Sequence, residues 1–264
     1  MTTVRDVFAF LEEKIPRSLS LNWDHDGLMC STDLDAEVHK ILLSLDMTRE
    51  ALRYAKQQGC NVCVTHHPLI FSPIDSVHPD TAKGQILIES IRSGISVLSY
   101  HTRLDRLSGG VNDVLAQLLK LQDVRPFGSP QEEVGRIGAL PVAMEFRSFC
   151  EMLRLVLGTP CLTCSTHPDF VRRIAVLGGS GKSDWQMALK AGADVFVTGE
   201  MTYNTMIDAF NEGFCVIEAG HDYTEKPVMQ ALEVLLKERF PNVETVHFDI
   251  SSSLVRINGG KNGI

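Results

Sequence analysis

Imidazole and carboxylate side chains are concentrated in three short segments of the sequence. One is the adjacent pair His66 and His67. The second is the stretch 101–105, with a histidine and an aspartate at its ends, and the third is the stretch 220–225, with a histidine and a glutamate. Neighbouring side chains of an extended chain point to opposite sides, so the histidine pair is suited to flank two ions. The three segments therefore predict a dinuclear metal centre.

The donor types limit the choice of metal. Imidazole nitrogens combined with carboxylate oxygens suit zinc, manganese, iron, cobalt or nickel, and we expect two such divalent ions per chain. The predicted metal ligands are His66, His67, Asp105, His221 and Glu225. Thr224 is a suitable helix N-cap and Pro227 fits a first helical turn, which predicts Glu225 at a helix N-terminus, where the dipole favours an ionised carboxylate.

Two further residues are candidates for proton transfer. Metal-bound histidines usually need a partner for their second ring nitrogen, and His101 and Glu200 each follow a predicted strand. We therefore predict both as catalytic residues that orient a ligand or carry a proton. The alternatives are a structural histidine at 101 and a helix-capping carboxylate at 200. No residues are assigned to an organic cofactor.

The composition restricts the class of protein. A chain of 264 residues, 44% of them hydrophobic, can bury the core of one large domain or two compact ones. It has no apolar run long enough for a bilayer and no secretory leader, so we expect a cytoplasmic protein with no membrane partner. A net charge of −8 without a Lys/Arg cluster argues against nucleic acid. A phosphorylated small molecule is compatible, because a metal would supply positive charge.

Strand and helix patterns alternate along the chain. Apolar residues at 4, 7, 8 and 11 have helical spacing, and a second helix is expected between a Thr48 cap and a Gly59 terminus. Apolar runs predict strands at 41–45, 61–65, 95–100, 174–177, 195–198 and 214–217. This alternation predicts an α/β fold with parallel sheet covered by helices.

An internal comparison predicts a duplicated α/β unit. Residues 40–67 align without a gap to 173–200, at an offset of 173 − 40 = 133, and 94–98 resemble 213–217. The candidate ligands fall at equivalent places after strands, where open α/β sheets bind ligands. The prediction is two similar repeats, 1–125 and 126–264, whose chain ends cross, with the metal site in the cleft between them. Chance likeness between segments rich in Val, Ala and Gly is the alternative.

Two other patterns receive a structural interpretation. The pairs Cys60/Cys63 and Cys161/Cys164 have metal-knuckle spacing but lie in apolar, strand-like sequence, so we expect buried, reduced thiols. The segment 178–183, Gly-Gly-Ser-Gly-Lys-Ser, resembles a phosphate-binding loop, yet Val176 stands where such a loop needs its first glycine. We expect a glycine-rich turn between a strand and a helix.

The motifs together resemble those of a known family. They are Trp-Asp-His-Asp-Gly-Leu at 23–28, Thr-His-His-Pro-Leu-Ile-Phe at 65–71, His-Thr-Arg-Leu-Asp at 101–105, Gly-Gly-Ser-Gly at 178–181, Thr-Gly-Glu at 198–200 and Gly-His-Asp-Tyr-Thr-Glu at 220–225. In order and number they are similar to the NGG-one-interacting-factor-three-like family, whose members are also named GTP cyclohydrolase 1 type 2 homologues. Asn204 departs from the pattern, since many members have a histidine soon after Thr-Gly-Glu.

The resemblance implies intertwined α/β repeats, a dinuclear divalent-metal centre bridged by Glu225, and a homohexamer. The family name implies a metal-dependent hydrolase that acts on a nucleotide or another phosphorylated small molecule through a metal-bridging water. The alternative is a non-enzymatic protein that binds or passes on metal, or serves as a scaffold. Turnover by the metal-loaded protein discriminates between these two classes.

Overall fold

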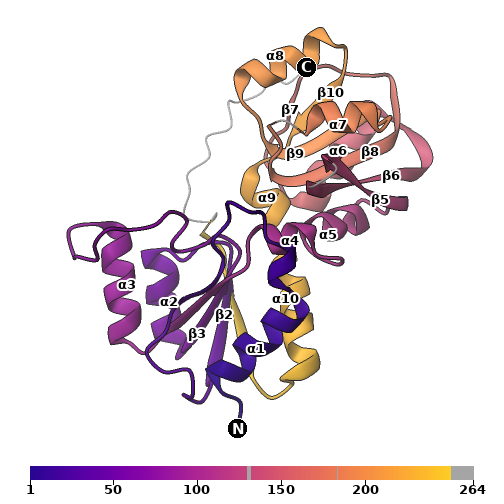
Figure 1. The fold of residues 1–264 in the computed structure, drawn as a ribbon. Helices are drawn as coiled ribbons and strands as arrows, with labels where there is room; N and C mark the ends of the chain where they lie inside the picture. The colour runs from indigo at the N-terminus through magenta and orange to yellow at the C-terminus, as the bar shows by residue number, and fades with distance from the viewer. Residues whose placement is uncertain (130–131, 183, 251–264) are drawn as a thin grey trace. The chain divides into compact units, whose positions relative to one another are not determined.

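The chain forms two compact units, each with its own β-sheet (Figure 1). The structure is a computed structural model that describes residues 1–250 apart from 130–131 and 183. Unit 1 contains Met1–Leu107 together with the described residues from Met229 onward, and unit 2 contains Ser108–Val228. Among the described residues, no helix combines the length and the apolar character needed to cross a membrane.

Unit 1 has three layers built on a five-stranded sheet. Its strands are β1 (Gly27–Cys30), β2 (Lys40–Ser44), β3 (Val62–Thr65), β4 (Ser96–Ser99) and β11 (Glu244–Phe248), in the order β1-β4-β3-β2-β11. All neighbours are parallel except β1 and β4. Helices α2 (Arg49–Gln58) and α3 (Ala82–Arg92) cover one face, and α1 (Val4–Lys14) and α10 (Val228–Arg239) cover the other (Figure 1).

The helix boundaries of unit 1 follow from local chemistry. The Thr48 hydroxyl accepts a hydrogen bond from the Ala51 N–H at 3.0 Å, which caps the first turn of α2. Gly59 ends that helix in the left-handed conformation, with φ of 72°. Both positions were predicted from the sequence and are confirmed.

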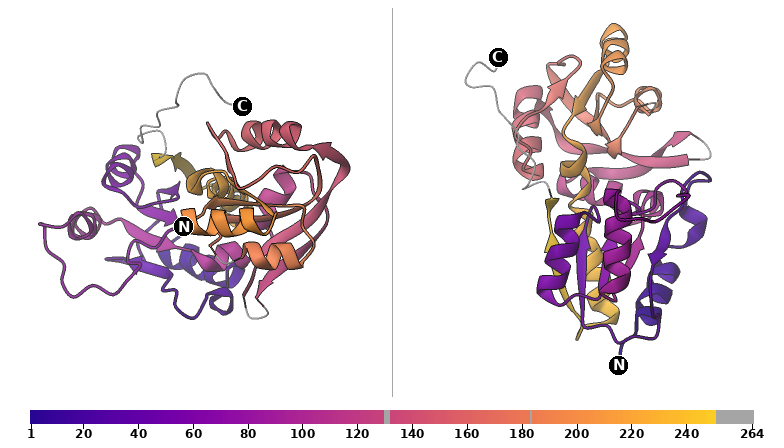
Figure 2. Two further views of the ribbon diagram at one scale, coloured as in Figure 1. Left: turned by 90° about the horizontal axis from the view of Figure 1, so that it is seen from above. Right: turned by 90° about the vertical axis from the view of Figure 1, so that its left-hand side faces the viewer.

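Unit 2 is also a three-layer α/β structure. Its strands are β5 (Gln122–Ser129), β6 (Glu132–Glu145), β7 (Thr163–Cys164), β8 (Phe170–Ser180), β9 (Val195–Glu200) and β10 (Cys215–Glu218), in the order β5-β6-β8-β9-β10-β7. Helices α5 (Val111–Leu118) and α6 (Phe146–Leu157) pack on one face, and α7 (Trp185–Lys190) and α8 (Tyr203–Asn211) pack on the other (Figure 2). The short helix α9 (His221–Glu225) follows β10.

The prediction of an α/β fold is confirmed, but the sheets are mixed rather than wholly parallel. Strands β2-β3-β4 and β8-β9-β10 form the parallel centres, while β1, β5, β6 and β7 pair antiparallel. Strands β1, β5 and β6 were missed: most residues of β5 are exposed, and Gly and Pro interrupt the apolar residues of β6. The short strand β7 lies in the strand-like sequence at 161–164.

The registers of the two sheets agree with the internal alignment. Ile41 pairs with Val62 in unit 1, and Ile174 pairs with Val195 in unit 2, so both partners move by 133 residues. Descent from a duplication stays a prediction. The repeat boundary predicted at 125/126 differs from the boundary between compact units at 107/108, because α5 packs in unit 2 while α10 and β11 belong to unit 1.

All seven cysteines are free in the structure. Cys60 and Cys63 are buried, and burial raises the pKa of the Cys60 thiol to about 11. The expected burial of the second pair is wrong, since Cys161 is exposed and Cys164 is half-buried at the short edge strand β7. Cys161 lies before this two-residue edge strand, and Cys164 in the strand has a neighbouring strand on one side only.

Candidate metal centre

Three histidines of unit 1 lie just beyond the carboxyl ends of parallel strands. His66 and His67 follow β3, and His101 follows β4. One ring nitrogen from each lies within 4.8 Å of those of the other two. We call these three residues the histidine cluster. The sequence analysis predicted His101 as a proton carrier and not as a metal ligand. In the structure its ring lies with the other two imidazoles.

The rings of His66 and His67 lie on one side of the chain, with centroids 4.9 Å apart. The prediction that they point in opposite directions is therefore wrong. Strand β3 ends at Thr65, so the alternation of side chains in a strand does not extend to the pair. The geometry of the pair alone fits one shared ion as well as two.

Each ring of the cluster has an oxygen partner for its Nδ1 nitrogen. The buried His66 ring donates to the Tyr100 carbonyl at 3.0 Å. His67 Nδ1 lies 2.9 Å from Asp46 Oδ1, and His101 Nδ1 lies 3.1 Å from an Asp24 oxygen. With the Nδ1–H as donor, the neutral ring carries its lone pair on Nε2, the nitrogen that binds a metal.

Asp24 is a buried carboxylate that accepts hydrogen bonds from His101 and Thr102. It accepts hydrogen bonds from the Thr102 N–H at 3.0 Å and from the Thr102 hydroxyl at 2.6 Å. Burial alone would raise the pKa of Asp24, but the hydrogen bonds from His101 and Thr102 lower it to about 2. The group is therefore a charged acceptor across the physiological range and fixes the orientation of the imidazole.

Asp105 approaches the cluster from α4 (Thr102–Arg106), and His66 Nε2 lies 3.6 Å from its Oδ1. The fully buried Arg103 anchors this helix. Its guanidinium donates to Asp26 Oδ1 at 2.7 Å, to Glu12 Oε1 at 2.9 Å, and to backbone carbonyls. Because Arg103 lies between His101 and Asp105 in sequence, this anchor holds both side chains in place.

The candidate ligands of unit 2 come from α9, which follows β10. His221 Nε2 lies 3.1 Å from Glu225 Oε1, one helical turn away, and Glu225 is buried. Glu200, at the end of β9, places Oε2 3.4 Å from His221 Nδ1. The side chain of Glu200 is half exposed, and its role in orienting His221 stays a prediction.

Thr224 and Glu225 differ from their predicted positions. Glu225 ends α9 instead of starting a helix, because α10 begins only at Val228. The Thr224 hydroxyl donates to the His221 carbonyl at 2.8 Å and accepts from the Gly179 N–H at 3.1 Å, so it caps no helix N-terminus. The Pro in the sequence marked a helix boundary, but the boundary lies after Glu225.

Close approach to α9 explains Gly179 and Gly199 of unit 2. A Cβ on Gly179, whose φ is 68°, would lie 2.2 Å from Glu225 Oε1, and one on Gly199 would lie 2.7 Å from His221 Cα. The Gly178 N–H donates to Asn112 Oδ1 at 2.8 Å. Gly178 and Gly179 are in β8, and their amides bond within the protein rather than to an anion. Ser183 lies outside the described residues.

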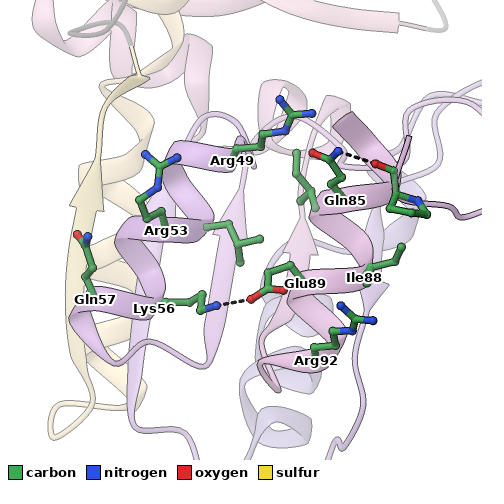
Figure 3. A pocket seen from close by; sticks show the side chains of 11 residues that line it. Arg49, Arg53, Lys56, Gln57, Gln85, Ile88, Glu89 and Arg92 are labelled. Carbon is green, nitrogen blue, oxygen red and sulfur yellow. Dashed lines mark hydrogen bonds and ion pairs between the residues drawn. The ribbon is translucent and has the colours of Figure 1, made fainter. Parts of the chain in front are cut away.

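The other residues noted in the sequence lie apart from these contacts. Asn204, the departure from the family pattern, is exposed on α8. A cavity of about 510 Å³ lies between α2 and α3, and the basic side chains that line it include Arg49, Arg53 and Arg92 (Figure 3). Lys56 forms an ion pair with Glu89 across it. This cavity contains none of the candidate ligands.

Asp24, Asp26 and Asp46 are site residues that sequence reasoning missed. Asp24 and Asp26 were visible only as part of the Trp-Asp-His-Asp-Gly-Leu motif, and Asp46 had no motif at all. Position could have indicated Asp46, since it follows β2, the strand next to β3. A carboxylate after a neighbouring parallel strand is well placed to orient a histidine.

Comparisons with known proteins agree with the motifs. The family model for Duf34/NIF3 (NGG1p interacting factor 3) matches residues 2–253. A GTP cyclohydrolase 1 type 2 homolog of Clostridium perfringens is 31% identical over 242 residues, which cover 89% of this chain and 92% of that protein. A homolog of the same name from Methanocaldococcus jannaschii is 31% identical, and the match covers 84% of this chain and 89% of that protein.

Solved structures give the same answer for the fold. The Bacillus cereus protein related to NIF3 superimposes with a TM-score of 0.86 at 25% identity, covering 93% of this chain and 96% of that one. The reduced HcgD protein of Methanocaldococcus jannaschii has a TM-score of 0.82 at 26% identity, covering 93% and 97%. The chain therefore belongs to the Duf34/NIF3 family.

Proposed function

We propose that this protein binds two divalent metal ions and hydrolyses a nucleotide or another phosphorylated small molecule. The observation that carries the proposal is the histidine cluster: the proposed ligands His66 and His67 each have an oxygen partner for Nδ1, and His101, which Asp24 holds in the same way, lies beside them. Histidines that bind metal in proteins are typically held in this way. The donor set, imidazole with carboxylate, fits zinc, manganese, iron, cobalt or nickel.

The proposed ligands are those of the sequence analysis. His66, His67 and Asp105 of unit 1 would bind the same pair of ions as His221 and Glu225 of unit 2, with Glu225 as the bridge, as the family resemblance implies. A pair of divalent ions acidifies water and stabilises negative charge that develops in a transition state. The duplication of the α/β repeat, the cleft location of the site and the assembly into cytoplasmic homohexamers belong to the same proposal.

His101 and Glu200 are the proposed proton carriers. Asp24 holds the Nδ1 proton of His101, so its Nε2 can accept a proton from water, and the Asp24 carboxylate stabilises the imidazolium that results. Glu200 is half exposed beside His221 and can pass a proton to solvent. The relatives named GTP cyclohydrolase 1 type 2 homolog suggest a purine ring as the group that water attacks.

Metal analysis and a substrate screen on one sample test the proposal. Protein purified without added metal or a metal-binding tag is analysed for metal per chain, reconstituted, and screened against nucleotides and phosphoesters. We expect close to two ions per chain, with turnover. The double variant His66→Ala, Glu225→Ala should lose the metal and the turnover. His247→Ala is the matched control, because the ring of His247 contacts Glu233 and is not a proposed metal ligand.

The outcomes separate the two function classes. Two ions per chain without turnover would favour the non-enzymatic alternative, a metal-handling or scaffold protein. Stoichiometric metal retained in the double variant would refute the ligand assignment. Absence of metal after reconstitution would refute the proposal as a whole.

A further inference from the structure

Two exposed aromatic rings stand beside the histidine cluster. Trp23 and Phe71 are 52% and 51% exposed, and we call this pair the aromatic wall. The ring centroids of Trp23 and Phe71 lie 6.1 Å apart, and those of His101 lie 6.0 Å from Trp23 and 5.8 Å from Phe71. Large aromatic side chains normally bury most of their surface, so a half-exposed pair in contact with a chemical site suggests a ligand surface.

The backbone holds both rings of the wall firmly. Trp23 lies in a tight turn closed by the Asp24 N–H, which donates to the Leu21 carbonyl at 2.9 Å. The Leu21 N–H donates to the Thr102 hydroxyl at 3.0 Å, and Thr102 in turn donates to Asp24. The exposure of Trp23 is therefore imposed by a hydrogen-bonded turn that also orients His101.

Phe71 is presented by an anchored segment as well. Leu69, two residues earlier, is buried in the core under α2 and α3, and the partly buried Ile70 packs against the same core. The Thr65 hydroxyl donates to the His67 carbonyl at 2.9 Å, which fixes the chain as it leaves β3. A ring held this way loses little conformational freedom when a ligand stacks on it.

We infer that the aromatic wall binds the planar heteroaromatic ring of the substrate by stacking. This inference rests on the proposed function and names the chemical class on which it acts, a purine-like or pyrimidine-like ring. Base stacking on aromatic side chains tolerates many bases, and contact with His101 brings the ring next to the proposed proton carrier. The wall is thus a positioning surface for the ring that is attacked.

Fluorescence can test the wall because the chain has only two tryptophans. Trp185 is 5% exposed in the core of unit 2, so Trp185→Phe leaves Trp23 as the single reporter. The probes are guanosine monophosphate and ribose 5-phosphate, which share the sugar phosphate and differ in the ring. Free tryptophan in parallel corrects for light absorbed by the purine. We expect saturable quenching by the nucleotide and none by the ribose.

Variants distinguish stacking from other roles of the wall. Phe71→Leu should weaken nucleotide binding about tenfold, as expected for one lost stacking partner, with metal per chain unchanged. Phe170→Leu is the matched control, because Phe170 is 64% exposed and lies in unit 2. Trp23→Leu, followed by calorimetry, checks the result if Phe71→Leu folds poorly. Quenching equal for both probes, or a loss of metal without a loss of ring binding, would overturn the inference.

Metal analysis of the same samples separates this inference from the proposed function. If the protein retains metal and turnover but shows no saturable ring binding, the stacking role of the aromatic wall is refuted and the proposed function stands. Protein that binds the ring through Trp23 but has neither metal nor turnover supports the wall and refutes the proposed function.

Discussion

Replacement of Asp26 by asparagine should destabilise unit 1 more than any equivalent change at the surface. The side chains of Asp26 and Arg103 are 0% and 1% exposed, and Asp26 also accepts from the His101 N–H at 3.1 Å. Asp26→Asn keeps the shape of the side chain but removes the charge that neutralises the guanidinium. In either orientation of the new amide, its NH2 group would face a donor, the His101 N–H or the Arg103 guanidinium.

The structure gives the size of the effect. Breaking a buried ion pair costs about 3–5 kcal/mol, since it leaves a charge without compensation in a medium that solvates it poorly. Arg103 still has Glu12 at 2.9 Å, so we expect the lower end, about 3 kcal/mol. Asp35→Asn is the control, because Asp35 accepts two hydrogen bonds from Arg5 at the surface, where solvent screens the pair.

Urea unfolding measures the change in each unit separately. Trp23 reports on unit 1 in a Trp185→Phe background, and Trp185 reports on unit 2 in a Trp23→Phe background. Asp26→Asn should lower the midpoint of the Trp23 transition by about 1–2 M urea. An Asp26→Asn midpoint that moves no more than the Asp35→Asn midpoint would show that burial does not strengthen the contribution of the Asp26–Arg103 ion pair to stability.

Three further predictions concern the site and the thiols. Gly179→Ala should lower metal per chain and the thermal midpoint, because the new Cβ would lie 2.2 Å from Glu225 Oε1; unchanged metal content would contradict the close approach. Asp46→Asn should weaken metal binding about 10–100-fold in competition with a chelator, since it replaces the charged acceptor that orients His67 with a neutral amide, and the variant should still fold. Alkylation at pH 8 should modify the exposed Cys161 first, because burial raises the pKa of the core thiols and keeps them protonated; early labelling of a core cysteine, seen by peptide mapping, would argue against this.

The parts of the site predictable from sequence are those set by strand ends. Parallel strands bring their carboxyl ends to one edge, so the histidines after β3 and β4 were expected to meet, and they do. The partners of those histidines were not predictable, since Asp24 lies 77 residues from His101 and Asp46 lies 21 residues from His67. Nothing local in the sequence links such pairs.

The fold shows the same division between local and distant causes. The helix after Thr48 and the buried strands of both parallel centres carry their own signals in caps and apolar runs. The edge strand β5 has mostly exposed residues and takes its conformation from its neighbour β6. The direction of the His66–His67 pair was mispredicted for a related reason, because the strand stops one residue too early for its periodicity to apply.

The pairing of β11 with β2 sets an order of events during synthesis. Glu244 pairs with Lys40, a separation of 244 − 40 = 204 residues, whereas the described part of unit 2 is one continuous stretch, Ser108–Val228. Contacts between distant residues form late, since a long loop must close first. On the ribosome, unit 2 can therefore complete its sheet while β2 still has an open edge. Such an edge is a site for wrong pairing between nascent chains, so β11, which emerges last among the described strands, protects unit 1 from aggregation.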